Sequence, residues 1–394
     1  MDIFEKCQAY TTAREMEARG LYPYFQPLED TEGTEVILHG KRILMIGSNN
    51  YLGLTTDPRV RQAAIDAIHR FGTSCTGSRF LNGTLALHQK LEARLADFVG
   101  KDAALVFSTG FQVNLGVISC LVQKGDVVIA DKDDHASIVD GCLLARGEMR
   151  RFRHNNMSHL EHVLTQSHPD AGKLVVVDGV YSMGGDLAPL PEIIPLCQQH
   201  GARLMVDDAH AVGVMGKGRG TASHFGVTGD VDLIMGTFSK SFASLGGFIA
   251  GDQDTIHYIQ HHARSLIFSA SMPASSVAAV LAALDIIENE PHRVERLWAV
   301  TERMRTGLIK MGYDTGPSVT PVIPIIIGGM EDTFKAWKMC LEMGLYTNPV
   351  IEPAVPPDSC LLRTSYMATH SDEQIDRALS ILGDVGRTLN LIPS

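Results

Sequence analysis

The sequence predicts an α/β protein in which a large domain, built on a doubly wound and mostly parallel β-sheet, is followed by a smaller α+β domain. Short, continuous apolar runs recur up to about residue 260, and stretches of helical periodicity separate them. Such runs indicate strands that are covered on both faces. Their alternation with helices is typical of a parallel sheet that has helices on both sides.

The N-terminal region, residues 1–55, is expected to contain a polar segment and then a small β-hairpin. The hairpin spans EVILHGKRILMIG (35–47) and is predicted to turn at Gly40 and Lys41.

Residues 56–290 are predicted to form the large domain. Helices are expected over LPEIIPLCQQHG (190–201) and over MPASSVAAVLAALDIIENE (272–290), which is apolar along its whole length. The strands expected for its sheet are AALVF (103–107), VVIAD (127–131), KLVVVD (173–178), ARLMVD (202–207) and DLIMGT (232–237).

Residues 291–394 are predicted to form the small C-terminal domain. Its expected elements are a strand at TPVIPIIIGG (320–329), a helix at DTFKAWKMCLEMG (332–344), a strand at LLRTSYM (361–367) and a last helix from Ser371 onwards. No internal repeat or low-complexity segment interrupts this order.

The composition excludes several classes of protein. With 45% hydrophobic and 20% charged residues, the 394-residue chain can bury a large core and does not resemble a disordered segment. The net charge of −11, from 34 Lys and Arg against 45 Asp and Glu, would repel a phosphate backbone, so nucleic acid is not an expected partner.

The cysteines and the apolar runs predict a cytoplasmic protein. The seven cysteines are scattered without a CxxC pair, which favours reduced thiols over a zinc or redox site. No apolar run approaches the roughly 20 residues of a membrane span, and the polar start lacks the features of a signal peptide. Any membrane contact would therefore be peripheral, and no metal site is expected: His159 and His162 in HLEH lie three residues apart without an HExxH motif.

Polar residues follow each predicted strand of the large domain. Open α/β sheets bind ligands outside the carboxyl ends of their strands. Each of these residues alone also suits a turn or a helix cap, but together they favour one ligand that touches five strand ends. In chain order, the candidates are Gly110 and Phe111, His135, Asp178 and Ser182, Asp207, Asp208 and His210, and Thr237, Ser239 and Lys240.

Lys240 is the candidate that is hardest to explain as structural. Its segment, GTFSKSFASLGGF (236–248), is small and apolar and contains no carboxylate to neutralise an ammonium group. Desolvation is expected to lower the pKa of Lys240 and make its amine available to a carbonyl compound. Two Gly-rich segments, GSRFLNGT (77–84) and GKGRGT (216–221), lack the spacing of nucleotide-binding loops.

These motifs together resemble those of the α-oxoamine synthases. The resemblance covers nearly the whole chain, and its motifs occur in the family's order. They are SNNYLGL (48–54), STGFQVN (108–114), DDHASIVDG (133–141), DGVYSMGGDLAPL (178–190), VDDAHAVGV (206–214), GTFSKSFASLGGF (236–248), IFSASMP (267–273) and LLRTSYMATH (361–370).

The resemblance implies a fold-type I transferase that uses pyridoxal 5'-phosphate to condense an amino acid with an acyl-CoA, releasing carbon dioxide. Lys240 would hold the cofactor as a Schiff base and later move the proton at the substrate Cα, while Asp207 would keep the pyridine nitrogen protonated. His135 would stack on the ring, and His210 and Ser182 would hydrogen-bond its phenolic oxygen.

The remaining roles that the resemblance implies concern the phosphate, the substrate and a second subunit. Main-chain N–H groups of Gly110 and Phe111 would hold the phosphate, with help from Thr237 and Ser239. Ser269 would reach the phosphate site of a neighbouring subunit, which makes a homodimer with active sites at its interface the expected catalytic unit.

Arg363 is the candidate for binding the amino acid carboxylate, because a guanidinium can pair with it through two hydrogen bonds. Asn49 and His135 would contact the same carboxylate. A surface strand arginine and a turn-forming asparagine are the competing interpretations. Arg79 is left open between a structural and a CoA-facing role. Gly184 departs from the family pattern, where a larger or acidic residue is common.

Three functional hypotheses remain open at this point. The segments GSRFLNGTLALH (77–88) and SYMATH (365–370) are similar to those of family members that join L-serine to a long-chain acyl-CoA such as palmitoyl-CoA. A sister enzyme would use glycine or alanine, although glycine-using members show a sequence nearer GKALGG around the lysine. A noncatalytic binding subunit of a synthase would lack the lysine, and Lys240 is present.

Overall fold

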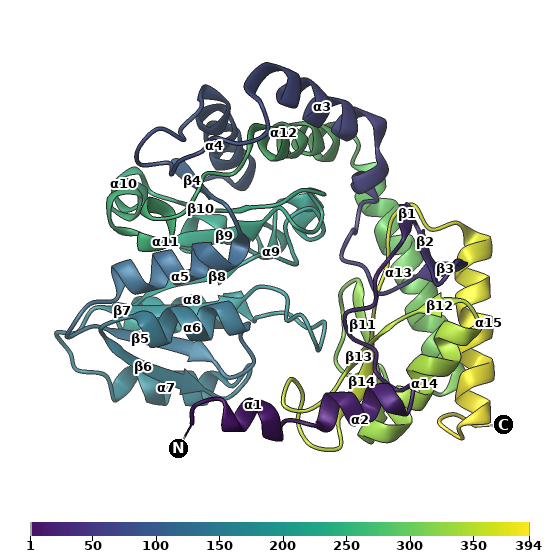
Figure 1. Ribbon diagram of the computed structural model, residues 1–394. Coiled ribbons are helices and arrows are strands. Elements are labelled where there is room, and N and C mark those ends of the chain that lie inside the picture. The colour runs from purple at the N-terminus through teal and green to yellow at the C-terminus, as the bar shows by residue number, and fades with distance from the viewer. Residues whose placement is uncertain (1, 394) are drawn as a thin grey trace. The chain divides into compact units, whose positions relative to one another are not determined.

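The computed structural model describes residues 2–393. Contacts within the chain separate two compact units (Figure 1). The larger unit comprises 49–298 and 319–321. The smaller comprises 299–318, 322–393 and the N-terminal residues up to 48. The domain bounds expected from the sequence, 1–55, 56–290 and 291–394, stay a prediction.

The larger unit is built on a seven-stranded sheet with the order β4-β10-β9-β8-β7-β5-β6. β10 is antiparallel to both of its neighbours, while the pairs from β9 to β6 are parallel. All five predicted strands are present, so the mostly parallel sheet is confirmed. The strands are β4 (Ala103–Phe107), β5 (Val127–Asp131), β6 (Glu148–Phe152), β7 (Lys173–Asp178), β8 (Arg203–Asp207), β9 (Leu233–Thr237) and β10 (Gly247–Gly251).

The sequence prediction missed two of these strands, for different reasons. β6 reads EMRRF and buries only Phe152, because it is an edge strand with mostly polar side chains. β10 reads GFIAG and is fully buried, but its two terminal glycines hide it among turn signals.

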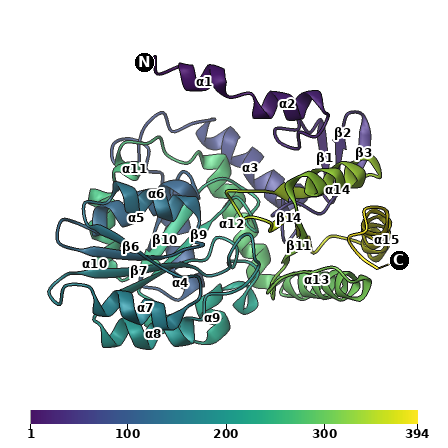
Figure 2. The same ribbon diagram turned by 90° about the horizontal axis from the view of Figure 1, so that it is seen from below.

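Helices cover both faces of this sheet. Figure 2 shows α5 and α6 on one face and α7 and α8 on the other. The helices of this unit are α3 (Pro58–Phe71), α4 (Ala86–Val99), α5 (Gly110–Leu121), α6 (Ala136–Leu144), α7 (Met157–Thr165), α8 (Leu190–Gln199), α9 (Thr221–Phe225), α10 (Gln253–His262), α11 (Arg264–Ile267) and α12 (Ala274–Asn289), with short 3₁₀ turns at Leu54–Thr56, Gly216–Gly218 and Thr228–Asp230. Helix α13 (His292–Met311) begins in this unit and ends in the smaller one.

The core explains why polar side chains gather at one edge of the sheet. β5, β7, β8 and β9 bury almost every residue, and their apolar side chains pack against those of α5 and α10. Because these strands are parallel, their carboxyl ends meet at one edge, and the polar residues that follow them lie there together.

The smaller unit contains two sheets. One has the order β1-β2-β3-β12 and the other the antiparallel order β11-β14-β13. The predicted helix over 332–344 and the helix after Ser371 are confirmed, and Ser371 caps the latter through Gln374 N. The elements are α1 (Glu5–Ala9), α2 (Thr12–Ala18), β1 (Asp30–Glu32), β2 (Glu35–Leu38), β3 (Lys41–Met45), β11 (Val322–Gly328), α14 (Met330–Glu342), β12 (Leu345–Tyr346), β13 (Asn348–Val350), β14 (Cys360–Ser365) and α15 (Asp372–Thr388).

The predicted hairpin is formed by β2 and β3, with one correction. Leu38 pairs with Lys41, so the two turn residues are His39 and Gly40, and not Gly40 and Lys41. Both have positive φ, 50° and 68°. This is the conformation of the two-residue turns that match the twist of a hairpin.

All seven cysteines are free thiols. Among residues 2–393, no helix is long and apolar enough to cross a membrane.

Candidate active site

A cavity of about 270 Å³ lies at the carboxyl edge of the seven-stranded sheet. Its walls come from residues that follow five strands and from the first turn of α5. Nine residues predicted for cofactor binding line it: Gly110, Phe111, His135, Ser182, Asp207, His210, Thr237, Ser239 and Lys240. The expectation that one ligand could reach all five strand ends is therefore compatible with the geometry.

One end of the cavity presents N–H groups and hydroxyls. Thr109 caps α5 by accepting a hydrogen bond from Gln112 N (3.1 Å), so the earlier N–H groups of Gly110 and Phe111 have no partner within the helix. Thr237 Oγ1 lies 3.0 Å from Ser239 Oγ. A Cβ at Gly110 would lie 2.8 Å from Thr237 Oγ1, so only glycine allows α5 to start this close to β9. An anion fits this end.

Asp207, the last residue of β8, is buried and accepts hydrogen bonds on both carboxylate oxygens. Asn114 Nδ2 donates to Oδ2 (2.7 Å), and the backbone N–H of Ala209 donates to Oδ1 (2.9 Å). Asn114 Nδ2 also contacts Ser137 Oγ at 2.8 Å, which fixes the amide. Donors to both oxygens fix the position of this carboxyl group at the edge of the cavity.

Lys240 lies in a tight turn after β9. The turn is closed by hydrogen bonds from Ala243 N to Lys240 O (3.0 Å) and from Ser244 N to Phe238 O (2.9 Å). Its own segment provides no carboxylate, as the sequence indicates, but Asp178 and Asp207 from neighbouring strands line the same cavity. The lowered pKa expected for Lys240 stays a prediction.

His135 caps α6 and faces the cavity. The backbone N–H of Ser137 donates to its Nδ1 (3.2 Å), so in the neutral ring the proton lies on Nε2. The surrounding protein desolvates the imidazole and, together with the charge of Lys240, lowers the pKa of His135 although Asp207 opposes the shift. The backbone N–H of His135 donates to Asp178 Oδ2 (3.0 Å).

Asp178, the last residue of β7, lies beside Asp207 of β8 and lines the same cavity. Burial, and next the negative charges of Asp207 and Asp134, raise the pKa of Asp178 well above its usual value.

His210 is oriented by Tyr51. Their Nδ1 and Oη atoms lie 2.8 Å apart, and both side chains are buried. Tyr51 Oη in turn lies 3.5 Å from Asn49 Oδ1. The predicted residue Asn49 thus lies next to a wall of the cavity, although it does not line it.

The other predicted residues lie outside the cavity lining. Ser269 accepts a hydrogen bond from Gln112 Nε2 (3.0 Å). Arg363 lies on β14 of the smaller unit and is only 6% exposed, which argues against a surface arginine. Arg79 forms a buried ion pair with Glu92, through Nη1–Oε1 at 2.7 Å and Nη2–Oε2 at 3.1 Å, and donates to Val106 O. These contacts support the structural role for Arg79, which stays a prediction.

Sequence reasoning missed Tyr51, Asn114 and Ser137 as parts of the site. Tyr51 and Asn114 occur in the motifs SNNYLGL and STGFQVN, and Asn114 lies one helical turn after Gly110, on the same side of α5. That spacing was the available signal for Asn114. Nothing local connects Tyr51 with His210.

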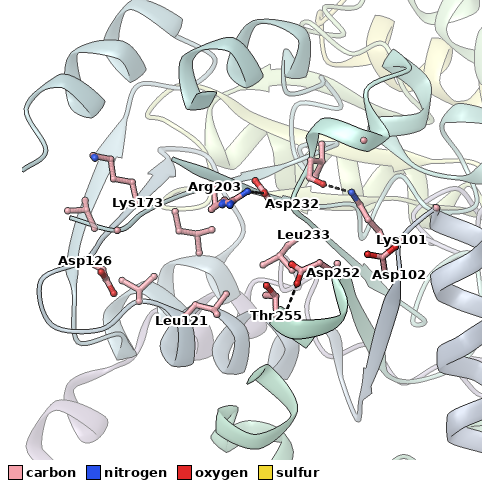
Figure 3. A pocket seen from close by; sticks show the side chains of 18 residues that line it. Lys101, Asp102, Leu121, Asp126, Lys173, Arg203, Asp232, Leu233, Asp252 and Thr255 are labelled. Atoms are coloured by element: carbon pink, nitrogen blue, oxygen red, sulfur yellow. Dashed lines mark hydrogen bonds and ion pairs between the residues drawn. The ribbon is translucent and has the colours of Figure 1, made fainter. Parts of the chain in front are cut away.

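A larger cavity, of about 770 Å³, lies at the opposite edge of the sheet, where β5, β7, β8 and β9 begin (Figure 3). Three of its charged side chains bind protein groups: Arg203 pairs with Asp232 (2.7 Å), and Lys101 donates to the carbonyl groups of Thr228 and Val231. Burial lowers the pKa of Lys101. None of the predicted catalytic residues lies there, so the smaller cavity is the candidate active site.

Comparison of the sequence with known proteins gives full-length relatives. The family model "Aminotransferase class I and II" matches residues 41–382. A serine palmitoyltransferase of Sphingobacterium spiritivorum is 50% identical, over 96% of this chain and 95% of its own length. An 8-amino-7-oxononanoate synthase of Geobacter metallireducens is 42% identical, over 96% of this chain and 97% of its own.

Solved structures give the same result. A Sphingomonas wittichii serine palmitoyltransferase is 40% identical and superposes with a TM-score of 0.97, with 100% of both chains covered. A serine palmitoyltransferase structure that contains pyridoxal phosphate is 37% identical, also with a TM-score of 0.97 and 100% of both chains covered. The chain therefore belongs to the class I and II aminotransferase family, as a fold-type I, pyridoxal-phosphate-dependent α-oxoamine synthase.

Proposed function

We propose that this enzyme is a serine palmitoyltransferase of sphingolipid biosynthesis. It condenses L-serine with palmitoyl-CoA, and the products are 3-ketodihydrosphingosine, CoA and carbon dioxide. The observation that carries this proposal is the 50% identity to a serine palmitoyltransferase over almost the whole chain, compared with 42% to an 8-amino-7-oxononanoate synthase.

The cavity fits pyridoxal phosphate at each of its functional groups. The N-terminus of α5 and the hydroxyls of Thr237 and Ser239 suit the phosphate, and glycine at position 110 lets that N-terminus lie close to Thr237. Asp207 suits the ring nitrogen. Lys240 suits the aldehyde carbon, His135 the ring face, and His210 and Ser182 the phenolic oxygen.

The cofactor supplies an electron sink for the carbanion at the substrate Cα. Asp207 keeps the ring nitrogen protonated, which the hydrogen bonds from Asn114 and Ala209 N support. Lys240 binds the cofactor before the amino acid arrives and then carries the proton at Cα. His210, whose Nδ1 is engaged by Tyr51, directs Nε2 to the phenolic oxygen.

The substrate carboxylate is assigned to Arg363, Asn49 and His135. The family resemblance supports this assignment, as does the low exposure of Arg363, because a buried guanidinium pairs more strongly with a carboxylate than an exposed one. The imidazole of His135, in its neutral form, can donate a hydrogen bond through Nε2.

The catalytic unit is assigned to a cytoplasmic homodimer in which Ser269 serves the neighbouring subunit's phosphate site. Exposed apolar side chains on the larger unit support a partner: Phe80, Leu81 and Phe268 are 58%, 77% and 72% exposed. The seven free thiols support a reducing compartment. Any contact with membranes is peripheral.

The test is a substrate matrix. Purified enzyme is offered serine, glycine or alanine, each with acetyl-CoA or palmitoyl-CoA, and thiol release is measured. Turnover that requires serine and palmitoyl-CoA supports the proposal. A preference for glycine or alanine with a short acyl-CoA assigns the sister activity, and no release with any pair leaves the noncatalytic subunit, a role that the presence of Lys240, Asp207, His135 and His210 argues against.

A further inference from the structure

His154, which follows the edge strand β6, is a half-buried histidine outside the cofactor cavity. Its Nδ1 lies 2.9 Å from Asp131 Oδ1, and its Nε2 lies 2.8 Å from Asp186 Oδ2. Burial alone would lower the pKa of His154, but the two carboxylates outweigh burial and raise it to about 10. At neutral pH both ring nitrogens therefore donate, and the ring is a cation between two carboxylates.

Asn155 donates hydrogen bonds to the same two carboxylates. Its backbone N–H donates to Asp131 Oδ2 (3.0 Å), and its Nδ2 donates to Asp186 Oδ2 (3.0 Å) and to Leu187 O (3.1 Å). Its φ of 48° is in the left-handed region, which asparagine tolerates better than most residues. His154 and Asn155 thus connect the end of β5 with the loop that follows β7.

That loop ends at the cofactor cavity. Its two sides are joined by the bridge between Val180 and Leu187 and by the hydrogen bond from Tyr181 N to Asp186 O (3.0 Å). Between them, a turn closed by Gly185 N and Tyr181 O (2.9 Å) contains Ser182, which lines the cavity.

Two neighbouring residues, Gly184 and Tyr181, help the charged side chain of Asp186 to hold this loop at His154. A Cβ at Gly184 would lie 2.5 Å from Asp186 Oδ1, so glycine at this position leaves the carboxylate room to reach His154. The ring of Tyr181 meets that of His154 edge-on, with centroids 4.4 Å apart. An uncharged contact also holds the loop: the hydroxyl of Thr320 donates a hydrogen bond to Gly185 O (2.8 Å).

We propose that His154 is a positioning residue of the cofactor site: it clamps Asp186 to Asp131 and thereby fixes the Ser182 hydroxyl at the phenolic oxygen of pyridoxal phosphate. The inference rests on the role proposed above for Ser182. It does not depend on which amino acid or acyl donor the enzyme uses.

The experiment is a double-mutant cycle on cofactor binding to the apoenzyme. His154→Ala, Ser182→Ala and the double variant are titrated with pyridoxal phosphate, and the absorbance spectrum of each complex is recorded. Each single variant is expected to bind the cofactor about tenfold more weakly, the scale on which groups that orient a directly binding residue act. His154→Ala should shift the cofactor's visible absorbance band in the same direction as Ser182→Ala. The double variant should match Ser182→Ala alone.

His168→Ala is the matched control, because His168 is 75% exposed and does not line the cofactor cavity; the cofactor affinity and spectrum of this variant should be unchanged. If His154→Ala does not fold, Asp186→Asn replaces it, since the amide keeps an acceptor oxygen but loses the charge. Additive losses, or an unchanged absorbance band, would overturn the proposal. Serine and acyl-CoA are absent from the assay, so failure of the proposed substrates would not affect its outcome.

Discussion

At the scale of single residues, the candidate site places two carboxyl groups at the ends of neighbouring strands. Asp207 accepts hydrogen bonds on both oxygens, from Asn114 Nδ2 and from Ala209 N, so its position is fixed. Burial, and next the charge of Asp207, raise the pKa of Asp178 well above its usual value. Asp207 is the carboxylate that we assign to the ring nitrogen.

Asp207→Asn is expected to keep the fold and lose most activity. The amide can still accept from Ala209 N but cannot balance a protonated ring nitrogen. Removal of a comparable electrostatic group lowers kcat on the order of 10²–10³-fold. Steady-state kinetics, with cofactor content measured in parallel, checks this. Asp254→Asn, at an exposed acid of α10, is the control, and near-normal turnover of the Asp207 variant would exclude the role.

Lys240→Ala is expected to abolish turnover and the covalent attachment of the cofactor. Purified wild-type enzyme should be yellow, and borohydride reduction should link the cofactor to Lys240 alone. Mass spectrometry of the digested protein identifies the modified peptide. Lys217→Ala, at a lysine of the short 3₁₀ turn in the same unit, serves as the control. Modification of any other lysine would contradict the assignment.

Arg363→Ala is expected to raise KM for the amino acid much more than KM for the acyl-CoA. Losing a single hydrogen bond to a charged group costs about 1.5–3 kcal/mol, so the serine KM should rise by at least about 10–100-fold. Arg387→Ala, at a half-exposed arginine of α15 that pairs with Asp384, is the matched control. Equal damage to both KM values would show a structural arginine.

At the scale of elements, Arg79 makes contacts with a helix and a strand that the sequence could not predict. Glu92, its partner, lies on α4, and Val106 O, which also accepts from it, lies on β4. Glu92 in turn accepts from Val106 N (3.0 Å). The pair thus fixes the loop before α4 to the edge of the sheet. No motif reports this, because the three residues are joined by packing and not by spacing in the chain.

Arg79→Ala is expected to destabilise the larger unit. Breaking a buried ion pair leaves an uncompensated charge at Glu92 and costs about 3–5 kcal/mol. The side chains of Arg79 and Glu92 are 7% and 14% exposed, which places the pair in this class. Urea unfolding of the apoenzyme measures the loss. Arg70→Ala, at an exposed arginine near the end of α3, should change the midpoint little, and an equally small effect at Arg79 would contradict the structural role.

At the scale of the whole molecule, the sequence predicted what depends on the order of elements. The parallel strands bring Gly110, His135, Asp207 and Lys240 to one cavity, because strand ends meet at one edge whatever the intervening loops do. Contacts across the fold could not be predicted in this way. Tyr51 and His210 are 159 residues apart, and nothing in either motif indicates that their side chains meet.

The acyl donor is expected to trigger the first bond cleavage in the bound amino acid. Two bonds of serine, Cα–H and Cα–carboxylate, compete for cleavage, and the one perpendicular to the cofactor ring breaks first. If Arg363 and His135 hold the carboxylate near the ring plane, early loss of carbon dioxide is suppressed, and cleavage of Cα–H awaits a rotation of the bound serine.

Binding energy from the remote acyl chain is expected to drive that rotation, since parts of a substrate that do not react can supply strain and orientation at the reacting centre. A long chain should therefore raise kcat as well as affinity. The measurement is the exchange of the α-hydrogen of serine with solvent, in the presence of an unreactive palmitoyl-CoA thioether and then of a short-chain analogue. Faster exchange is expected with the long thioether, and in Arg363→Ala the exchange should depend less on it, because the carboxylate is no longer held. An exchange rate that is the same with both analogues would show that the acyl chain does not drive the rotation. The roles of Lys240 and Asp207 would be unaffected, because those residues act on the proton and on the ring whatever starts the rotation.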